Sequence, residues 1–180
     1  LHGSNTDAPG LLAHLQASAP DWDASVTPVM VLGAGGATRA AIFALLQAGA
    51  PEIRLSNRTR AKAEVLADAF GEKVKVIDWS ERSSALAGCG LLVNTTSLGM
   101  TGQPALDIVL EDLPGTAVVY DIVYSPLETP LLAAARARGN QSVDGLGMLL
   151  HQATPGFEAW FGVKPVVDAT LRDVILADLT

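Results

Sequence analysis

The chain has 180 residues, a formal net charge of −7, 49% hydrophobic residues and 17% charged residues. This length suits one domain with its own core, and the apolar content excludes a disordered chain. The acidic balance argues against a duplex nucleic-acid binder, which usually carries a basic face. A single cysteine, Cys89, excludes a disulfide framework and favours a reducing compartment.

Other features narrow the class of protein further. The sequence has no uncharged apolar stretch of about 18 residues, so no membrane span is expected. Its first residues, 1–5, lack the basic and apolar regions of a signal peptide, which predicts a soluble cytoplasmic domain. The three histidines (His2, His14 and His151) are scattered without metal-ligand spacing, so no metal site is expected. Cys89 lies between two glycines and is interpreted as a small core residue.

The chain begins with a helical pattern and a linker. Apolar side chains at one face predict a helix over residues 7–18, and Asn5, Thr6 and Asp7 supply the side chains typical of a helix start. Residues 20–28 are polar and turn-rich, which indicates a linker. We therefore treat residues 1–27 as a hinge helix and linker.

From residue 29 onward, short apolar runs alternate with helical patterns. Strands are predicted at 29–32, 53–55, 74–77, 91–93 and 117–120, and helices at 36–48, 60–70, 80–87 and 130–138. Strands that are apolar on both faces and alternate with helices predict a doubly wound α/β domain, with helices on both faces of a parallel sheet. We assign residues 28–145 to this domain. Two further helices, at 146–161 and 166–178, are expected to pack within a segment 146–180 back on the hinge.

A glycine cluster follows the first predicted strand. Gly33, Ala34, Gly35, Gly36 and Ala37 lie between a strand and a helix, which is the place of the phosphate-binding turn in a Rossmann-type fold. Glycine permits a tight turn and close backbone approach, and the helix start offers free N–H groups to a pyrophosphate. The third glycine of the fingerprint is replaced by a threonine, so a glycine-rich turn without a ligand is the alternative.

The residues after the second predicted strand favour NADP over NAD. An NAD site would carry an Asp or Glu here for the ribose hydroxyls. This segment instead holds Asn57 and Thr59 together with three cations, Arg58, Arg60 and Lys62. A guanidinium suits the 2′-phosphate of NADP in both charge and geometry. The alternative is a solvated helix start, although cations there oppose the helix dipole.

Several segments in one order resemble the shikimate dehydrogenase family. They are residues 3–7 (GSNTD), 33–40 (GAGGATRA), 57–59 (NRT), 94–100 (NTTSLGM) and 144–152 (DGLGMLLHQ). The family pattern has a glycine after the aspartate of the first segment, where this chain has Ala8. The resemblance implies NADP-linked interconversion of 3-dehydroshikimate and shikimate, with a small-molecule substrate as the partner.

The resemblance also implies roles for individual residues. Asp7 matches an aspartate that acts with a catalytic lysine in proton transfer. The residues matching substrate contacts are Asn5, Thr6, Tyr124 and Gln152. Those matching the cofactor site, besides the glycine loop and residues 57–62, are Thr95, Ser97, Ile122, Gly145 and Met148. As alternatives, Asp7 could be only a helix-start carboxylate, Tyr124 a loop aromatic and Gln152 a solvated helix residue.

One part of the family pattern has no counterpart in this sequence. Family members carry an N-terminal substrate domain that supplies the catalytic lysine, and none of Lys62, Lys73, Lys75 and Lys164 lies in that context. We therefore expect the 180-residue chain to fold but to lack turnover by itself. Two alternatives stay open: a quinate/shikimate relative with another substrate preference, and an NADP-binding module without catalysis. The joint presence of Asp7, Tyr124 and Gln152 argues against a pure cofactor-binding module.

Overall fold

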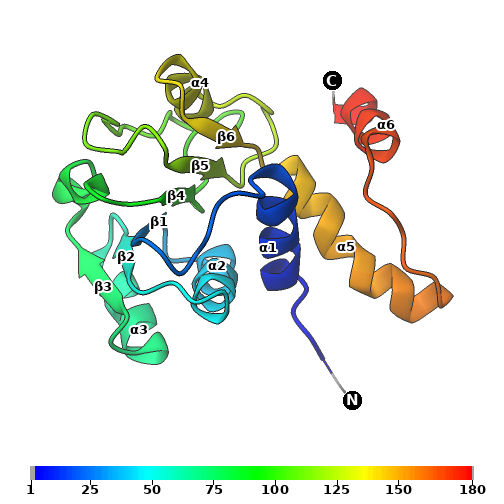
Figure 1. Ribbon diagram of the computed structural model, residues 1–180, viewed down its shortest axis with the longest axis horizontal. Helices are drawn as coiled ribbons and strands as arrows, with labels where there is room; N and C mark the ends of the chain where they lie inside the picture. Colours follow the sequence, from blue (N-terminus) through cyan, green and yellow to red (C-terminus); the bar gives the residue numbers. More distant parts are fainter. Residues whose placement is uncertain (1–2, 180) are drawn as a thin grey trace.

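The computed structural model describes residues 3–179 and has one six-stranded parallel sheet at its centre (Figure 1). The strands are β1 (Val29–Leu32), β2 (Ile53–Ser56), β3 (Val74–Ile77), β4 (Leu91–Asn94), β5 (Val118–Asp121) and β6 (Gln141–Val143). Their order is β3-β2-β1-β4-β5-β6, so the winding direction reverses between β1 and β4. This arrangement confirms the predicted doubly wound Rossmann-type fold.

Helices cover both faces of the sheet. They are α1 (Asp7–Ser18), α2 (Gly36–Gln47), α3 (Arg60–Phe70), α4 (Pro130–Ala137), α5 (Leu146–Phe161) and α6 (Ala169–Leu179), with short 3₁₀ turns η1 (Trp79–Glu81) and η2 (Ser84–Leu86). Alternate residues of β1 pack into separate cores on the two faces of the sheet. Val29 and Val31 pack with α1, α2 and α3, whereas Met30 and Leu32 pack with η2 and α4. The strand period of two therefore explains why the run is apolar throughout.

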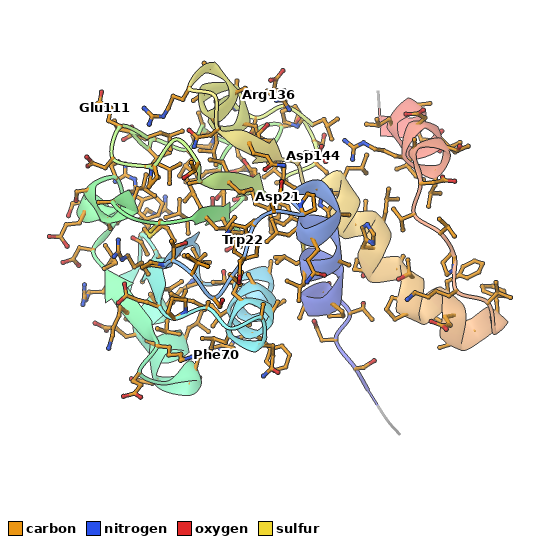
Figure 2. All side chains as sticks on the ribbon, in the orientation of Figure 1. Asp21, Trp22, Phe70, Glu111, Arg136 and Asp144 are labelled. Atoms are coloured by element: carbon orange, nitrogen blue, oxygen red, sulfur yellow. The ribbon has the colours of Figure 1, made fainter. Side chains whose placement is uncertain are left out.

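Helix α1 lies between α2 and α5, as Figure 1 shows. The α1–α5 contact is close because Gly10 lies against the backbone of Gln152, and a Cβ at Gly10 would come within 2.7 Å of the Gln152 Cα. The turn between α1 and β1 is anchored by Trp22, which packs against the main core (Figure 2). Helix α6 lies beyond α5, away from the sheet (Figure 1).

Two predicted helices differ from the structure, and one strand of the structure was not predicted. The helix expected over 80–87 is replaced by η1 and η2, because side chains there bond to backbone: the Ser84 hydroxyl donates to Glu81 O, and Arg82 donates to Trp79 O. The last helix begins at 169 instead of 166, since Asp168 Oδ1 accepts the N–H of Leu171 at 2.9 Å and acts as the cap. Strand β6 was not predicted; it is short and its first residue is exposed at the sheet edge.

Within residues 3–179, no helix is both long enough and apolar enough to cross a membrane.

Candidate functional site

Two hollows lie at the carboxyl end of the sheet, one lined by the loop after β1 and the other reaching the first turn of α2. The first, here called the loop hollow, has a volume of about 280 Å³ and is lined by Gly33, Ala34, Gly35, Asn57, Arg58, Thr59, Lys62, Thr95 and Thr96. The second, here called the α1–α5 hollow, has a volume of about 270 Å³ and is lined by Asp7, Ala37, Ile122, Tyr124, Gly145, Met148, Leu149 and Gln152. In open α/β sheets, ligands bind at this edge where the strand order reverses.

The loop after β1 is held by a chain of hydroxyl groups. Thr38 Oγ1 accepts the N–H of Gly35 at 2.9 Å and shares a hydrogen bond with Thr95 Oγ1 at 2.7 Å. Thr95 Oγ1 donates to the carbonyl of Leu32 at 2.6 Å. Thr38, which replaces the third glycine of the fingerprint, therefore ties the start of α2 to the end of β4.

Glycine is needed for different reasons at two positions of this loop. Gly33 has φ +118°, and a Cβ there would lie 2.6 Å from Thr95 Oγ1, so both conformation and space require glycine. Gly35 has nothing within 4 Å of a Cβ position, which leaves room above it. Its backbone can therefore be approached closely from outside.

The segment after β2 presents free positive charge to the loop hollow. Arg58 and Lys62 are exposed, and among the described residues 3–179 neither forms an ion pair. Arg60, the other predicted cation, pairs instead with Glu64 and Asp78 outside this hollow. Asn57 Nδ2 donates to the carbonyl of Thr59 at 2.8 Å, which shapes the turn between them.

A buried carboxylate supports the loop after β4. Asp121 accepts hydrogen bonds from the Thr129 hydroxyl, the Val123 N–H and Asn94 Nδ2. Asn94 Oδ1 in turn accepts from the N–H and hydroxyl of Thr96. Burial raises the pKa of Asp121 above its ordinary value, although its hydrogen bonds oppose that shift. This network fixes the loop on which Thr95 and Ser97 lie.

Ser97 lines a smaller adjoining hollow of about 200 Å³, together with Asn57 and Arg58. Trp79, Gln103 and Pro104 also line it, and none of these three was predicted as a site residue. No local sequence signal marks them, because they reach the hollow from a 3₁₀ turn and a loop without a motif.

The α1–α5 hollow collects the residues that the family resemblance assigns to substrate. Asp7 begins α1, Tyr124 follows β5 with 40% of its surface exposed, and Gln152 lies on α5. Thr6 is placed at its rim, where its hydroxyl donates to Gln152 Oε1 at 3.2 Å. Residues far apart in sequence therefore meet at one place.

The start of α1 is capped by a residue one position earlier than its formal cap. Asn5 Oδ1 accepts the N–H of Asp7 at 3.0 Å and of Ala8 at 3.4 Å. Asp7 is therefore not needed as the cap. It lines the α1–α5 hollow, and its Oδ2 accepts a hydrogen bond from Asn5 Nδ2 at 3.4 Å. Asn5 and Gly36 also line a neighbouring hollow of about 560 Å³ between α1 and α2.

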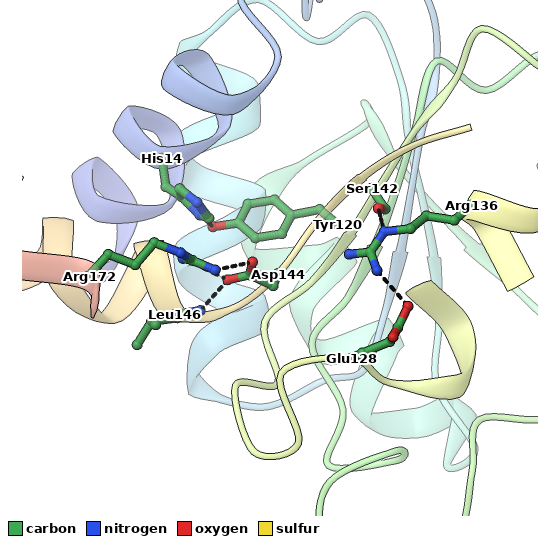
Figure 3. Close-up of polar contacts among 8 residues, drawn as sticks. All are labelled: His14, Tyr120, Glu128, Arg136, Ser142, Asp144, Leu146 and Arg172. Carbon is green, nitrogen blue, oxygen red and sulfur yellow. Dashed lines mark hydrogen bonds and ion pairs between the residues drawn. The ribbon is translucent and has the colours of Figure 1, made fainter. Parts of the chain in front are cut away.

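One buried pair of polar side chains was not predicted. His14 Nδ1 lies 2.9 Å from the Tyr120 hydroxyl (Figure 3), joining α1 to β5. Burial lowers the pKa of His14 to about 4, with His151 and Arg172 acting in the same direction and Asp144 opposing them. Burial raises the pKa of Tyr120 above its ordinary value. Both groups are therefore neutral at pH 7, and the sequence offered only an isolated histidine on an apolar helix face.

Within the described part of the chain, no group of three or more His, Cys, Asp and Glu side chains is arranged to hold a metal ion. Among the described residues, the site consists of a glycine loop, a helix start, two cations without an ion pair and, beside them, the mainly apolar α1–α5 hollow with its few polar side chains. These features define a doubly wound dinucleotide-binding domain.

Comparison with known families agrees with this class. Residues 15–103 match the family model for shikimate / quinate 5-dehydrogenase, and residues 145–172 match the model for the shikimate 5′-dehydrogenase C-terminal domain. The shikimate dehydrogenase (NADP(+)) of Azorhizobium caulinodans is 58% identical over 179 residues, which cover 99% of this chain and 64% of that protein. This chain belongs to the shikimate dehydrogenase family. It spans somewhat less than two thirds of the length of such relatives.

Solved structures show the same fold. Quinate dehydrogenase from Corynebacterium glutamicum in complex with NAD superimposes with a TM-score of 0.88 at 31% identity, covering 97% of this chain and 63% of that one. Shikimate 5-dehydrogenase from Thermus thermophilus in complex with NADP(H) and shikimate gives a TM-score of 0.78 at 38% identity, covering 91% and 59%.

Proposed function

We propose that this chain binds NADP(H) and forms the cofactor side of an enzyme that interconverts 3-dehydroshikimate and shikimate. Its pyrophosphate site would be the loop after β1 with the start of α2, where Gly35 leaves its backbone open. The proposal keeps the domain division expected from the sequence: hinge 1–27, nucleotide domain 28–145 and closing helices 146–180. The name of the relative from A. caulinodans supports the same activity.

The observation that carries the cofactor choice is the pair of free cations in the loop hollow. Arg58 and Lys62 lie where a carboxylate would select NAD, and they reach the same hollow as Gly33 and Gly35. The third cation, Arg60, is already paired with two carboxylates, so we assign the 2′-phosphate to Arg58 with help from Lys62. Asn57, Thr59, Thr95 and Ser97 would complete this side.

The α1–α5 hollow would hold the reacting ends of cofactor and substrate. Ala37, Ile122, Gly145 and Met148 would flank the nicotinamide, which supplies or accepts the hydride when bound. Asp7 would orient the substrate hydroxyl and share its proton with a lysine. Tyr124 and Gln152 would hydrogen-bond the substrate, with Thr6 fixing the amide of Gln152 and Asn5 holding the start of α1.

The lysine would come from a substrate domain, in the part of the relatives that this chain does not span. The protein would act in the cytoplasm on a small molecule. A quinate/shikimate dehydrogenase is a second candidate, because the structure from C. glutamicum, named for quinate and bound to NAD, is similar over nearly the whole chain. Substrate preference separates the two, so oxidation of shikimate is compared with oxidation of quinate once the chain is joined to a substrate domain.

Calorimetric titration of the 180-residue chain with NADP⁺ and NAD⁺ tests the proposal. We expect NADP⁺ to bind at least about tenfold more tightly, which corresponds to about 1.4 kcal/mol. Arg58→Gln should remove most of this preference, whereas Arg60→Gln, a matched control with its cation already paired, should keep it. Equal affinities in the wild-type chain would contradict NADP selection, and an absence of binding would contradict the cofactor site itself.

A further inference from the structure

A bidentate ion pair joins helix α6 to the carboxyl end of the sheet. Arg172 Nη2 lies 2.6 Å from Asp144 Oδ2, and Nη1 lies 3.2 Å from Oδ1 (Figure 3). The two side chains are 29% and 16% exposed, so the pair is largely shielded from water. A bidentate guanidinium–carboxylate pair fixes orientation as well as distance.

Asp144 uses the same carboxylate to begin α5. Its Oδ1 accepts the N–H of Leu146 at 3.0 Å, directly after β6 ends at Val143. A helix start relies on such an acceptor because its first N–H groups have no partner within the helix. The orientation of Asp144 therefore sets where the first turn of α5 lies, and Arg172 sets the orientation of Asp144.

That first turn forms one wall of the α1–α5 hollow and has little freedom to be displaced. A Cβ at Gly145 would lie 2.0 Å from the carbonyl oxygen of Ile122, and one at Gly147 would lie 2.0 Å from His14 Nε2. The turn is thus pressed against the strand end on one side and against α1 on the other. A small shift of Asp144 would be passed directly to Gly145, Ile122 and Met148, which line the hollow.

We propose that Arg172 is a positioning residue: through Asp144 it holds the Gly145–Met148 turn against Ile122 and so shapes the wall on which the nicotinamide rests. This inference rests on the proposed function, because it assumes that the α1–α5 hollow receives the nicotinamide. Arg172 itself lies on α6, outside that hollow, and acts through the carboxylate.

The test compares Arg172→Gln with Arg136→Gln in the 180-residue chain. Arg136 is a matched control: it also pairs with a carboxylate, Glu128, and donates to Ser142, but on the α4 side (Figure 3). Hydrogen exchange of residues 144–150 is measured in the free protein. Calorimetry then gives affinities for NADP⁺ and for 2′-phospho-ADP-ribose, which lacks the nicotinamide.

In Arg172→Gln we expect exchange of residues 144–150 to rise about tenfold and NADP⁺ to bind about fivefold more weakly, a loss of about 1 kcal/mol. The affinity for 2′-phospho-ADP-ribose should not change, and Arg136→Gln should alter none of the three quantities. Arg172→Lys keeps the charge without the two-pronged geometry, so intermediate values are expected.

Unchanged exchange in Arg172→Gln overturns the inference, as does an equal loss of affinity for both ligands, which would indicate general destabilisation. A wild-type chain that binds neither ligand overturns the proposed function. In that case the exchange comparison still decides whether Arg172 holds the turn.

Discussion

The two hollows at the carboxyl end of the sheet are built in different ways. The loop hollow is shaped by short segments that directly follow β1, β2 and β4. Hydrogen bonds of Thr95 tie the segment after β4 to Thr38 of α2 and to Leu32 at the end of β1. The α1–α5 hollow is assembled from both ends of the chain, and its shape depends on Gly10 against Gln152 and Gly145 against Ile122. The shape of the loop hollow thus follows from the strand register, whereas the shape of the α1–α5 hollow follows from close packing between distant segments.

The largest loss of stability should come from a substitution at the closest contact of the α1–α5 hollow. Gly145→Ala would place a methyl group 2.0 Å from the backbone oxygen of Ile122, and backbone cannot swing aside as a side-chain tip can. We expect a loss of about 3 kcal/mol in the free energy of unfolding, measured by urea denaturation. Gly115→Ala, with nothing within 4 Å of its Cβ position, is the control. Similar losses in both variants would show that the turn is not tightly packed.

A second effect concerns pH. Since the pKa of His14 is about 4 in the folded chain and 6.5 in its ordinary state, the unfolded chain binds an additional proton between these values. Stability contributed by neutral His14 is therefore present above pH 6.5 and is lost as the pH falls toward 4. We expect the wild type to lose about 2 kcal/mol between pH 7 and pH 5 relative to His14→Gln.

Denaturation of both proteins at the two pH values checks this. Asp121, whose pKa is raised by burial, contributes with the opposite sign, but it is present in both proteins and cancels in the difference. An identical pH dependence in the two proteins would mean that His14 is not held neutral against Tyr120.

The smallest effect should be at the surface, away from both hollows. Glu128 and Arg136 form an ion pair in which the side chains are 57% and 53% exposed. Glu128→Gln should change the free energy of unfolding by less than about 0.5 kcal/mol, because water screens such pairs. A loss as large as that of Gly145→Ala would show that exposed polar pairs hold the fold.

This contrast explains what the sequence could predict. The parallel sheet, the helix over 60–70 and the glycine loop depend on local patterns, and all three are found as expected. Strand β6 was missed because its first two residues, Gln141 and Ser142, are polar and gain a partner only at the sheet edge.

The contacts around the α1–α5 hollow could not be predicted from local sequence patterns. The His14–Tyr120 bond spans 106 positions and the Arg172–Asp144 pair spans 28, and neither follows from a helix or strand period. Only the family resemblance brought Asp7, Tyr124 and Gln152 together before the structure did. The catalytic role of Asp7 and the substrate-binding roles of Tyr124 and Gln152 stay predictions.

The role of Asp7 in proton transfer is tested by joining the chain to the part of the A. caulinodans relative that it does not span, and by comparing the wild type with Asp7→Asn. NADP⁺-dependent oxidation of shikimate and NADP⁺ affinity are measured for both. Asn5 caps α1 in either protein, so Asp7→Asn should fold normally and bind NADP⁺ equally well. We expect kcat to fall by about 10²–10⁴. A fall of less than about fivefold would show that Asp7 is only part of a helix start and that the α1–α5 hollow is not where the proton is transferred.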